Sequence, residues 1–377
     1  KFLNFVIENS PLNKINKVKY KQSIKSLFYP ESISNLYIEQ ALEMYVNHLN
    51  SDLLTPLGRR LHSIMTRESI KQGAHFLNAV DYNSDMYNDP IFVVGLPRSG
   101  TTNLHNMIIN EFGYSAFEYW QLASPKNIYN NPSIDRSFRK LRSIVGFYLY
   151  RYLIPSIQSM HNVNMNTYEE CWHFQKNLFL CYNYVIQLKF RDLEDYMKSN
   201  DSRFMFEGYK QFLLRNQINN DTHFALKCPE HLMFTDTIDE IFPESTIIWI
   251  HRHPFESISS YCPMIDSVWK LFMGKTDKKD LVQFIVHLYD RMLRKMMTDR
   301  DKIKCNIIDV SYSDLINRRE NIYNYLKTRI KSYKEYRCNT SNPSFFKNKH
   351  KMKPYPISEA SINEHFSFYL DSYKDYL

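Results

Sequence analysis

The segment Pro90–His105 reads PIFVVGLPRSGTTNLH and carries residues that suit the binding of an anion. Residues 91–94 are four consecutive apolar residues, which predict a short buried strand. A loop bounded by Gly95 and Gly100 follows, and the residues after it predict a helix. The amides of such a loop point inward, and the helix N-terminus adds partial positive charge. We therefore predict an anion-binding loop at the end of this strand.

The loop departs from the nucleotide-binding pattern GxxxxGK[ST] at the position that contacts a triphosphate. Gly95 and Gly100 have the required spacing, and Thr102 supplies the hydroxyl. Thr101 replaces the lysine that would reach the β- and γ-phosphates, and a cation lies instead within the loop, at Arg98. The loop is therefore suited to an anion but lacks the usual means of gripping a triphosphate.

A second informative segment is residues 223–262, HFALKCPEHLMFTDTIDEIFPESTIIWIHRHPFESISSYC. Residues 224–226 predict a strand that ends in Lys227, and residues 229–242 have apolar side chains at helical spacing. Residues 246–250 are rich in β-branched side chains and predict a buried central strand. His-Arg-His-Pro follows this strand at 251–254, so a second concentration of basic residues lies at a strand end.

The basic strand end separates classes of nucleotide-binding protein. An ATP or GTP hydrolase needs Mg²⁺, which is usually held by an aspartate at the end of a neighbouring strand. The sequence His251-Arg252-His253 would repel a divalent cation and attract a phosphate, so we expect no metal site. A P-loop nucleotide or small-molecule kinase is the alternative, as is a non-catalytic nucleotide-binding protein of the same fold. A separate and simpler alternative is that Arg252 only pairs with a surface carboxylate.

Together the two segments resemble the motifs of sulfotransferases that use 3′-phosphoadenosine 5′-phosphosulfate (PAPS). In that family an arginine at a strand end and a serine eight positions later hold the 3′-phosphate, and Arg252 and Ser260 have this separation. Lys227 begins a segment that resembles the LKxPxH element of the large bacterial-type branch, where a lysine lies near the transferred sulfuryl group. The resemblance implies that the 5′-phosphosulfate is held by Pro97, Arg98, Ser99, Gly100, Thr101 and Thr102.

The resemblance implies an α/β fold, a three-layer P-loop-like sandwich with a central parallel sheet and helices on both faces. We expect residues 1–89 to form a helical N-terminal extension on the core and residues 90–377 to form the sulfotransferase domain. The implied reaction moves the sulfuryl group of PAPS to a hydroxyl or amine of a small-molecule or lipid-like acceptor and leaves adenosine 3′,5′-bisphosphate (PAP). Arg98 and Lys227 would neutralise charge on the leaving phosphate without a metal.

The general base that deprotonates the acceptor is not assigned by the resemblance. Cytosolic sulfotransferases that act on phenols and steroids carry Lys-Thr-His, whereas this chain has Lys-Cys-Pro at 227–229, and proline cannot act as a base. The candidates are His231, His161 and Glu170, with Glu118 as a further one. The family's stacking tryptophan after the Thr-Thr pair is also absent, so another aromatic residue must stack on the adenine.

Composition limits the classes of partner and compartment. The chain has 377 residues and a net charge of +8, which suits an anionic cofactor and does not require nucleic acid as a partner. The longest apolar run, residues 145–154, is short and contains Arg151, so we expect no integral membrane segment. The six cysteines form no CxxC motif, which favours reduced thiols and a cytoplasmic location. The chain begins at Lys1, so an upstream targeting segment or anchor could have been removed.

Two further segments give coarser expectations. Residues 112–157 are aromatic and irregular, and in the family the corresponding segment helps to wall the acceptor pocket. Residues 358–376 predict one last helix.

Overall fold

The computed structural model describes residues 14–27, 35–78, 88–156, 165–179, 181–199, 202–217, 221–331 and 355–377. The chain divides into two compact units. The helical unit comprises Lys1–Asp85, Glu118–Asn216 and Ile265–Thr276, and the sheet unit comprises Met86–Phe117, Gln217–Met264 and Asp277–Leu377. The sequence analysis divided the chain once, between residues 89 and 90, and that division into an extension and a catalytic domain stays a prediction.

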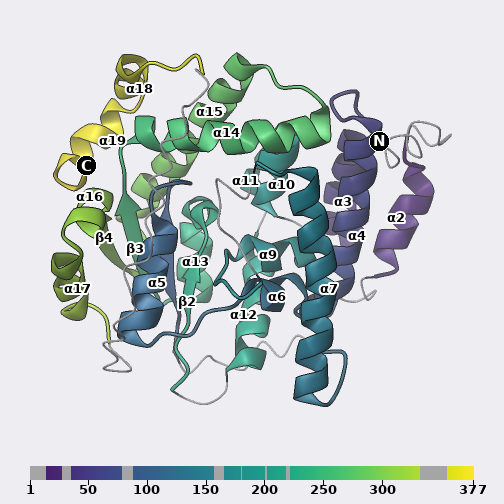
Figure 1. The fold of residues 1–377 in the computed structure, drawn as a ribbon, viewed down its shortest axis with the longest axis horizontal. Helices are drawn as coiled ribbons and strands as arrows, with labels where there is room; N and C mark the ends of the chain where they lie inside the picture. The colour runs from purple at the N-terminus through teal and green to yellow at the C-terminus, as the bar shows by residue number, and fades with distance from the viewer. Residues whose placement is uncertain are drawn as a thin grey trace. The chain divides into compact units, whose positions relative to one another are not determined.

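The sheet unit is built on a four-stranded parallel sheet (Figure 1). Its strands are β1 (Ile91–Gly95), β2 (Ala225–Lys227), β3 (Thr246–His251) and β4 (Asn306–Ser311), in the order β2-β1-β3-β4. The chain passes from β1 to β2 on one side of β1 and returns to β3 on the other side. Ligands in open parallel sheets bind at the carboxyl ends of the strands, where the strand order reverses in this way. The parallel α/β fold is therefore confirmed, and it places a binding position beyond β1 and β3.

Helices surround this sheet. Helix α5 packs against β1 and β2, the 3₁₀ turn η2 against β1, and η3 against β4. The helical elements of the sheet unit are α5 (Thr101–Phe112), η2 (Pro229–Met233), α13 (Thr235–Ile241), α15 (Lys278–Asp299), α16 (Tyr312–Asn317), α17 (Arg319–Lys327), α18 (Glu359–His365), α19 (Ser367–Ser372) and η3 (Lys374–Tyr376). Helix α14 (Pro254–Met273) begins in this unit and ends in the other.

The helical unit contains no β-strand among its described residues. Its elements are α2 (Lys17–Lys25), α3 (Asn35–Leu49), α4 (Pro56–Asn78), α6 (Tyr119–Ala123), α7 (Pro132–Leu153), α9 (Trp172–Gln175), η1 (Lys176–Leu178), α10 (Tyr182–Leu188), α11 (Arg191–Ser199) and α12 (Arg203–Asn216). Helix α4 packs against η1 and α12, and α7 packs against α6. None of the helices in the described part of the chain is long and apolar enough to cross a membrane.

The two strand segments that carry the basic motifs lie where the sequence predicted them, but the helix predicted over residues 229–242 is wrong. The structure has the 3₁₀ turn η2 and then α13, separated at Phe234, whose φ of −133° is not helical. The single last helix predicted over residues 358–376 is also wrong. It is divided into α18, α19 and η3, with breaks at Phe366 (φ −100°) and Tyr373 (φ −123°).

The irregular structure predicted over residues 112–157 is wrong as well, because this range contains the 22-residue helix α7. Its start is strongly specified: the Asn131 side chain accepts hydrogen bonds from the amides of Ser133 and Ile134, and Pro132 occupies the first turn. Most large apolar residues of this helix, from Ile134 to Tyr152, recur at helical spacing but lie on its exposed face, and Phe147 is the large apolar residue that is buried.

A buried polar network ties β3 and β4 to the surrounding helices of the sheet unit. His251 is completely buried, and its Nε2 lies 2.8 Å from Oδ1 of Asp309, while its Nδ1 lies 2.9 Å from the hydroxyl of Tyr369. Arg300 binds both oxygens of Asp309, at 2.9 and 2.5 Å. Burial alone would raise the pKa of Asp309, but the hydrogen bonds from His251 and Arg300 outweigh it and lower this pKa.

We predict that Asp309→Asn lowers the free energy of unfolding by about 2–4 kcal/mol, because it leaves the Arg300 guanidinium without its counter-charge. Urea denaturation measures this loss. Asp290→Asn is the matched control: Asp290 pairs with Arg294 of α15, whose side chain is half exposed, so its loss should cost less than about 1 kcal/mol. Equal effects of the two substitutions would contradict the assigned role of Asp309.

Candidate functional site

The loop after β1 contains two residues with positive φ angles, one of which is not glycine. Arg98 adopts a φ of 69° and Gly100 a φ of 93°. The amide of Ser99 donates to the carbonyl of Leu96 at 3.0 Å and closes the turn. A left-handed conformation at a non-glycine residue is costly, and such residues concentrate at ligand-binding sites. The sequence prediction of a tight loop between a strand and a helix agrees with this geometry.

Glycine is required at position 100 for two reasons. Its φ is positive, and an added Cβ atom would lie 2.6 Å from the ring of Tyr312 at the start of α16. Gly100 is also the residue before α5, and no side chain caps the amides of the first turn of that helix. The N-terminus of α5 is thus left without a capping side chain, which suits the binding of an anion.

Two side chains to which the sequence analysis assigned no role bind the loop from helices α14 and α15. The hydroxyls of Ser257 and Tyr289 both donate to the carbonyl oxygen of Pro97, at 2.5 and 2.8 Å. Ser257 lies on α14 and Tyr289 on α15, and both are completely buried. No motif identifies Tyr289, because its role depends on the packing of a helix that begins some 20 residues after Ser257. These contacts fix the position of the loop relative to β3 and α14.

The strand end of β3 and the loop of β1 meet in the structure. Gly95 is the register partner of Ile250, so the residues that follow these two strands emerge side by side. Arg252 donates from Nη1 to the carbonyl oxygen of Arg98 at 2.6 Å, and Nε of Arg98 lies 3.2 Å from Oγ of Ser260. The structure therefore brings Arg98, Arg252 and Ser260 together, and their role in holding an anion stays a prediction.

Arg252 is further oriented by two neighbours. Its Nε donates to Oε2 of Glu256 at 3.0 Å, and its guanidinium carbon lies 4.2 Å from the centroid of the Tyr312 ring. The stacking contact restricts the guanidinium to one plane and leaves its charge close to the loop. Tyr312 thus contacts the site at two points, Gly100 and Arg252, and the sequence analysis assigned it no role.

Lys227 brings a third cation to the strand ends. It is the last residue of β2, its side chain is completely buried, and its Nζ lies 3.1 Å from Oγ1 of Thr102 in the first turn of α5. Because β1 and β2 are paired in parallel, Lys227 reaches α5 from the side of the loop opposite to β3. The cations of Arg98, Lys227 and Arg252 therefore surround the end of β1.

A buried hydroxyl supports the assignment of an anion site. Ser99 is completely buried, and its Oγ has no hydrogen-bond partner among the described residues. Ser259 on α14 is also buried, and its Oγ likewise has no hydrogen-bond partner among the described residues. Buried hydroxyls are nearly always hydrogen bonded, so a hydroxyl without a protein partner beside an anion-binding loop fits contact with a bound group. The residues present thus suit a phosphate or sulfate ester.

The candidate bases have different surroundings. His231 lies in η2, is completely buried and packs edge-on against Phe92 of β1, and burial lowers its pKa to about 3. Glu170, in the helical unit, accepts a hydrogen bond from Nε1 of Trp172 at 3.1 Å. Glu118 accepts from Trp120 at the start of α6. His161 lies outside the described residues. His231 has the properties of a core histidine rather than of a group that exchanges protons near neutral pH.

A carboxylate on the neighbouring strand β4 is already engaged. Asp309 of β4 is the register partner of Trp249, and its two oxygens are held by Arg300 and His251. Among the described residues no group of three or more His, Cys, Asp or Glu side chains could hold a metal ion. The arrangement at the strand ends is therefore cationic, with amides, hydroxyls and three basic side chains available for an anion.

Comparisons with known proteins agree with this arrangement. A family model described as "Sulfotransferase family" matches residues 90–329. The structure is similar to sulfotransferase STF9 from Mycobacterium avium, with a TM-score of 0.71 and 16% identity, covering 96% of this chain and 97% of the other. It is also similar to sulfotransferase STF1 from Mycobacterium tuberculosis H37Rv, with a TM-score of 0.70 and 16% identity, covering 94% and 99%. No curated protein sequence matches the chain.

We predict that Gly100→Ala destabilises the protein by about 1–3 kcal/mol and lowers its affinity for inorganic pyrophosphate at least tenfold, because the loop must move away from Tyr312. Gly146→Ala is the control, since an added Cβ on α7 meets no atom within 4 Å and should stabilise the helix by about 0.5–1 kcal/mol. Calorimetric titration and thermal unfolding measure the two effects. Unchanged pyrophosphate affinity in Gly100→Ala would show that the loop is not the anion site.

Proposed function

Because the chain belongs to the sulfotransferase family, we propose that it transfers the sulfuryl group of PAPS to a hydroxyl or amine of a small-molecule or lipid-like acceptor. The observation that carries the proposal is the contact between the two anion-binding motifs. Arg252 binds the loop carbonyl of Arg98, and Arg98 binds Ser260. A donor with phosphates at both its 5′ and 3′ positions needs two such anion sites close together.

The residues that follow β1 and those that follow β3 recognise different parts of the donor. We propose that residues 97–102 and the uncapped start of α5 hold the 5′-phosphosulfate, with the Ser99 hydroxyl as one donor. Arg252 and Ser260 hold the 3′-phosphate. The donor supplies an activated sulfuryl group with adenosine 3′,5′-bisphosphate as the leaving group. Tyr312 and Glu256 act indirectly, by keeping the Arg252 guanidinium in place.

The two remaining cations act on the charge that develops in the transfer. Lys227 is buried and lies beside Thr102 at the start of α5, and Arg98 lies within the loop. In a buried setting, a fixed cation stabilises negative charge on a leaving oxygen more strongly than it would in water. We propose that Arg98 and Lys227 stabilise the leaving phosphate oxygen, so that no metal is required for this step.

The general base stays the least determined part of the proposal. We favour Glu170 or His161 over His231, because complete burial and a pKa lowered to about 3 leave His231 neutral and shielded near pH 7. A neutral imidazole with so low a pKa is a weak acceptor of a proton from a hydroxyl. The carboxylate of Glu170 already accepts a hydrogen bond from Trp172, which fixes its orientation.

The two alternatives explain the site less well. A P-loop kinase would use a lysine at position 101 and an acidic strand end for Mg²⁺, but the chain has Thr101, and Asp309 is bound by Arg300 and His251. A binding protein without activity would not need the buried Lys227 beside the helix start. A cytoplasmic location is part of the proposal, supported by the burial of the five described cysteines and by the lack of a CxxC motif in the sequence.

We predict that the protein binds PAP at least a hundredfold more tightly than AMP, because the additional 3′-phosphate makes charge-assisted hydrogen bonds to Arg252 and Ser260. Arg252→Ala should remove most of this preference while leaving the affinity for AMP nearly unchanged. Calorimetric titration of both nucleotides measures the preference directly.

Arg294→Ala is the control for this titration, since Arg294 is a half-exposed arginine of α15 that pairs with Asp290. It should retain the full preference for PAP. Equal affinities of the unaltered protein for PAP and AMP would refute the assigned 3′-phosphate site.

We predict that Arg98→Ala and Lys227→Ala each lower kcat roughly a hundredfold at every pH, because both remove charge stabilisation rather than a proton acceptor. Glu170→Gln should instead leave PAP affinity intact and abolish the acidic limb of the pH–rate profile, which reports protonation of the base. Steady-state rates between acidic and alkaline pH distinguish the two classes. If Glu170→Gln keeps the acidic limb, the base is His161 or another residue. An acidic limb centred near pH 3 would instead identify His231 as the base.

A further inference from the structure

Helix α7 presents its large apolar side chains to solvent. Their exposed fractions lie between 41% and 81%. The face that packs inward carries Arg139, Ser143 and Phe147, of which two are polar. The usual arrangement of an amphipathic helix, with polar residues outward, is therefore reversed. The exposed set, which we call the α7 stripe, consists of Ile134, Phe138, Leu141, Val145, Tyr148, Leu149 and Tyr152.

The α7 stripe is larger than the incidental apolar surface of a monomeric protein. Large side chains have about 150–250 Å² of surface when fully exposed, so the stripe amounts to on the order of 800 Å². The largest apolar patch of a typical monomer is about 300–600 Å². Ile128 and Tyr129, in the loop before α7, are also 41% and 44% exposed and extend the apolar surface beyond the helix start.

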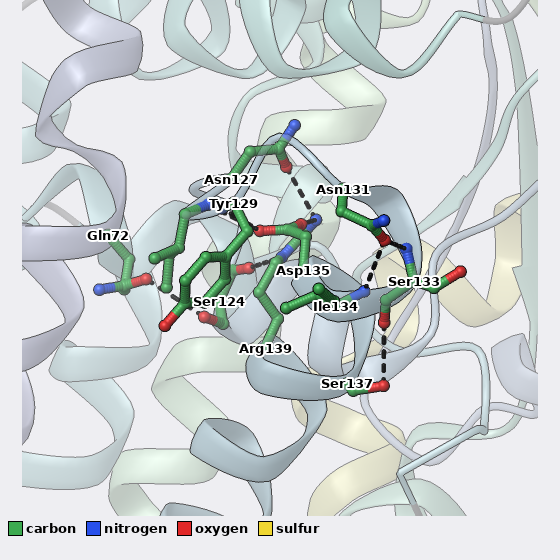
Figure 2. Close-up of polar contacts among 11 residues, drawn as sticks. Gln72, Ser124, Asn127, Tyr129, Asn131, Ser133, Ile134, Asp135, Ser137 and Arg139 are labelled. Carbon is green, nitrogen blue, oxygen red and sulfur yellow. Dashed lines mark hydrogen bonds and ion pairs between the residues drawn. The ribbon is translucent and has the colours of Figure 1, made fainter.

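The loop before α7 is held rigidly against the helix (Figure 2). Oδ1 of Asp135 accepts hydrogen bonds from the amides of Ile128 and Tyr129, at 2.6 and 3.1 Å. Arg139 pairs with Asp135 at 3.3 Å and donates to the Asn127 side chain at 2.9 Å. Burial would raise the pKa of Asp135, but these amide and arginine contacts lower it. The apolar side chains of the loop are thus presented by a fixed backbone.

Basic side chains outnumber acidic ones around the α7 stripe, and the two acids that reach it from neighbouring elements, Glu68 and Glu118, are paired with Arg142 and Lys140. The only acid of the helix is Asp135, which is buried in the network just described. With 100° between successive residues, Arg142 lies along one edge of the stripe and Arg151 along the other. Arg142 is 3.3 Å from Glu68 of α4, but this is an exposed ion pair, which contributes little and can exchange for another anion. The basic residues of the loop and helix outside the buried network are Lys126, Arg136, Lys140, Arg142 and Arg151.

An apolar stripe on a helix can pack against a second copy of the helix or against a lipid surface. The charged residues of α7 favour the lipid surface. The spacing of four and three residues from Ile134 to Tyr152 would allow two copies of α7 to pair as a coiled coil. Such pairs need acids beside the seam to meet the arginines of the partner, and α7 exposes none. Tyr148 and Tyr152 would also bring hydroxyls into the seam, whereas tyrosine is favoured at the boundary between lipid chains and headgroups.

We propose that the α7 stripe docks on the surface of an anionic phospholipid membrane. The helix lies in the plane of the interface, with Leu141, Val145 and Tyr148 facing the acyl chains and Arg142 and Arg151 facing lipid phosphates. This attachment is peripheral and does not require a membrane-spanning segment. It rests on the helical unit alone and does not depend on the proposed chemistry.

Two valines of equal exposure allow a matched test. Val145 in the stripe is 65% exposed, and Val18 on α2 is 64% exposed. The purified protein is mixed with vesicles of phosphatidylcholine and phosphatidylglycerol, or of phosphatidylcholine alone, and sedimented. We expect the unaltered protein to partition at least tenfold more strongly onto the anionic vesicles. Val145→Glu should lower this partition at least tenfold, and Val18→Glu less than twofold, because both add the same charge but only one adds it within the stripe.

Two other outcomes of these experiments would overturn the proposal. Loss of vesicle binding by the same factor in both variants would show that the net charge of +8 acts without the stripe. Sedimentation velocity without lipid tests the packing against a second copy. A dimer that Val145→Glu dissociates, in a protein that does not bind vesicles, would assign the stripe to a second copy of the chain. Unchanged thermal unfolding of both variants confirms that the comparison is made between folded proteins.

Discussion

The candidate site depends on the parallel pairing of β1 with β3. Because Gly95 and Ile250 are register partners, the loop after one strand and the arginine after the other leave the sheet at the same edge. The hydrogen bond from Arg252 to the carbonyl of Arg98 joins them. A shift of the register by one residue would move Arg252 away from the loop and turn its side chain to the other face. The proposed binding of a donor with two separated anionic groups depends on this one register.

The packing of the sheet unit preserves that pairing. Ser257 and Tyr289 hold the carbonyl of Pro97 from two different helices, and His251 is fixed by Asp309 and Tyr369 directly before Arg252. These residues determine where the cations can lie, and that explains why so many buried polar contacts are concentrated beside the ends of β1 and β3.

Local patterns were sufficient to predict the strands and the tight loop after β1, while the binding of an anion by this loop stays a prediction. β1 and β3 are short apolar runs followed by glycine or basic residues, and neither depends on distant packing to be recognised. The roles of Tyr289 and Tyr312 could not be predicted, because each contacts the loop from a helix far along the chain. The same limit applies to His231: its sequence position beside Lys227 suggested chemistry, whereas its burial against Phe92 is a property of the fold.

Helix α7 shows a different limit of sequence patterns. A helix normally places its apolar residues on the buried face, whereas most of those of α7 lie at helical spacing on its exposed face, so the sequence pattern does not show which face is buried. Departure from the expected pattern at a well-formed helix indicates a function for the exposed residues rather than a defect of folding.

The central claim is that the paired ends of β1 and β3 form a metal-free site for a sulfuryl donor. Incubation with PAPS carrying a radiolabelled sulfuryl group, a pool of hydroxyl-bearing acceptors and excess chelator tests this claim most directly. The account predicts transfer of the label to an acceptor at the same rate with and without chelator. Absence of transfer from PAPS, together with Mg²⁺-dependent transfer of phosphate from ATP to the same pool, would contradict it.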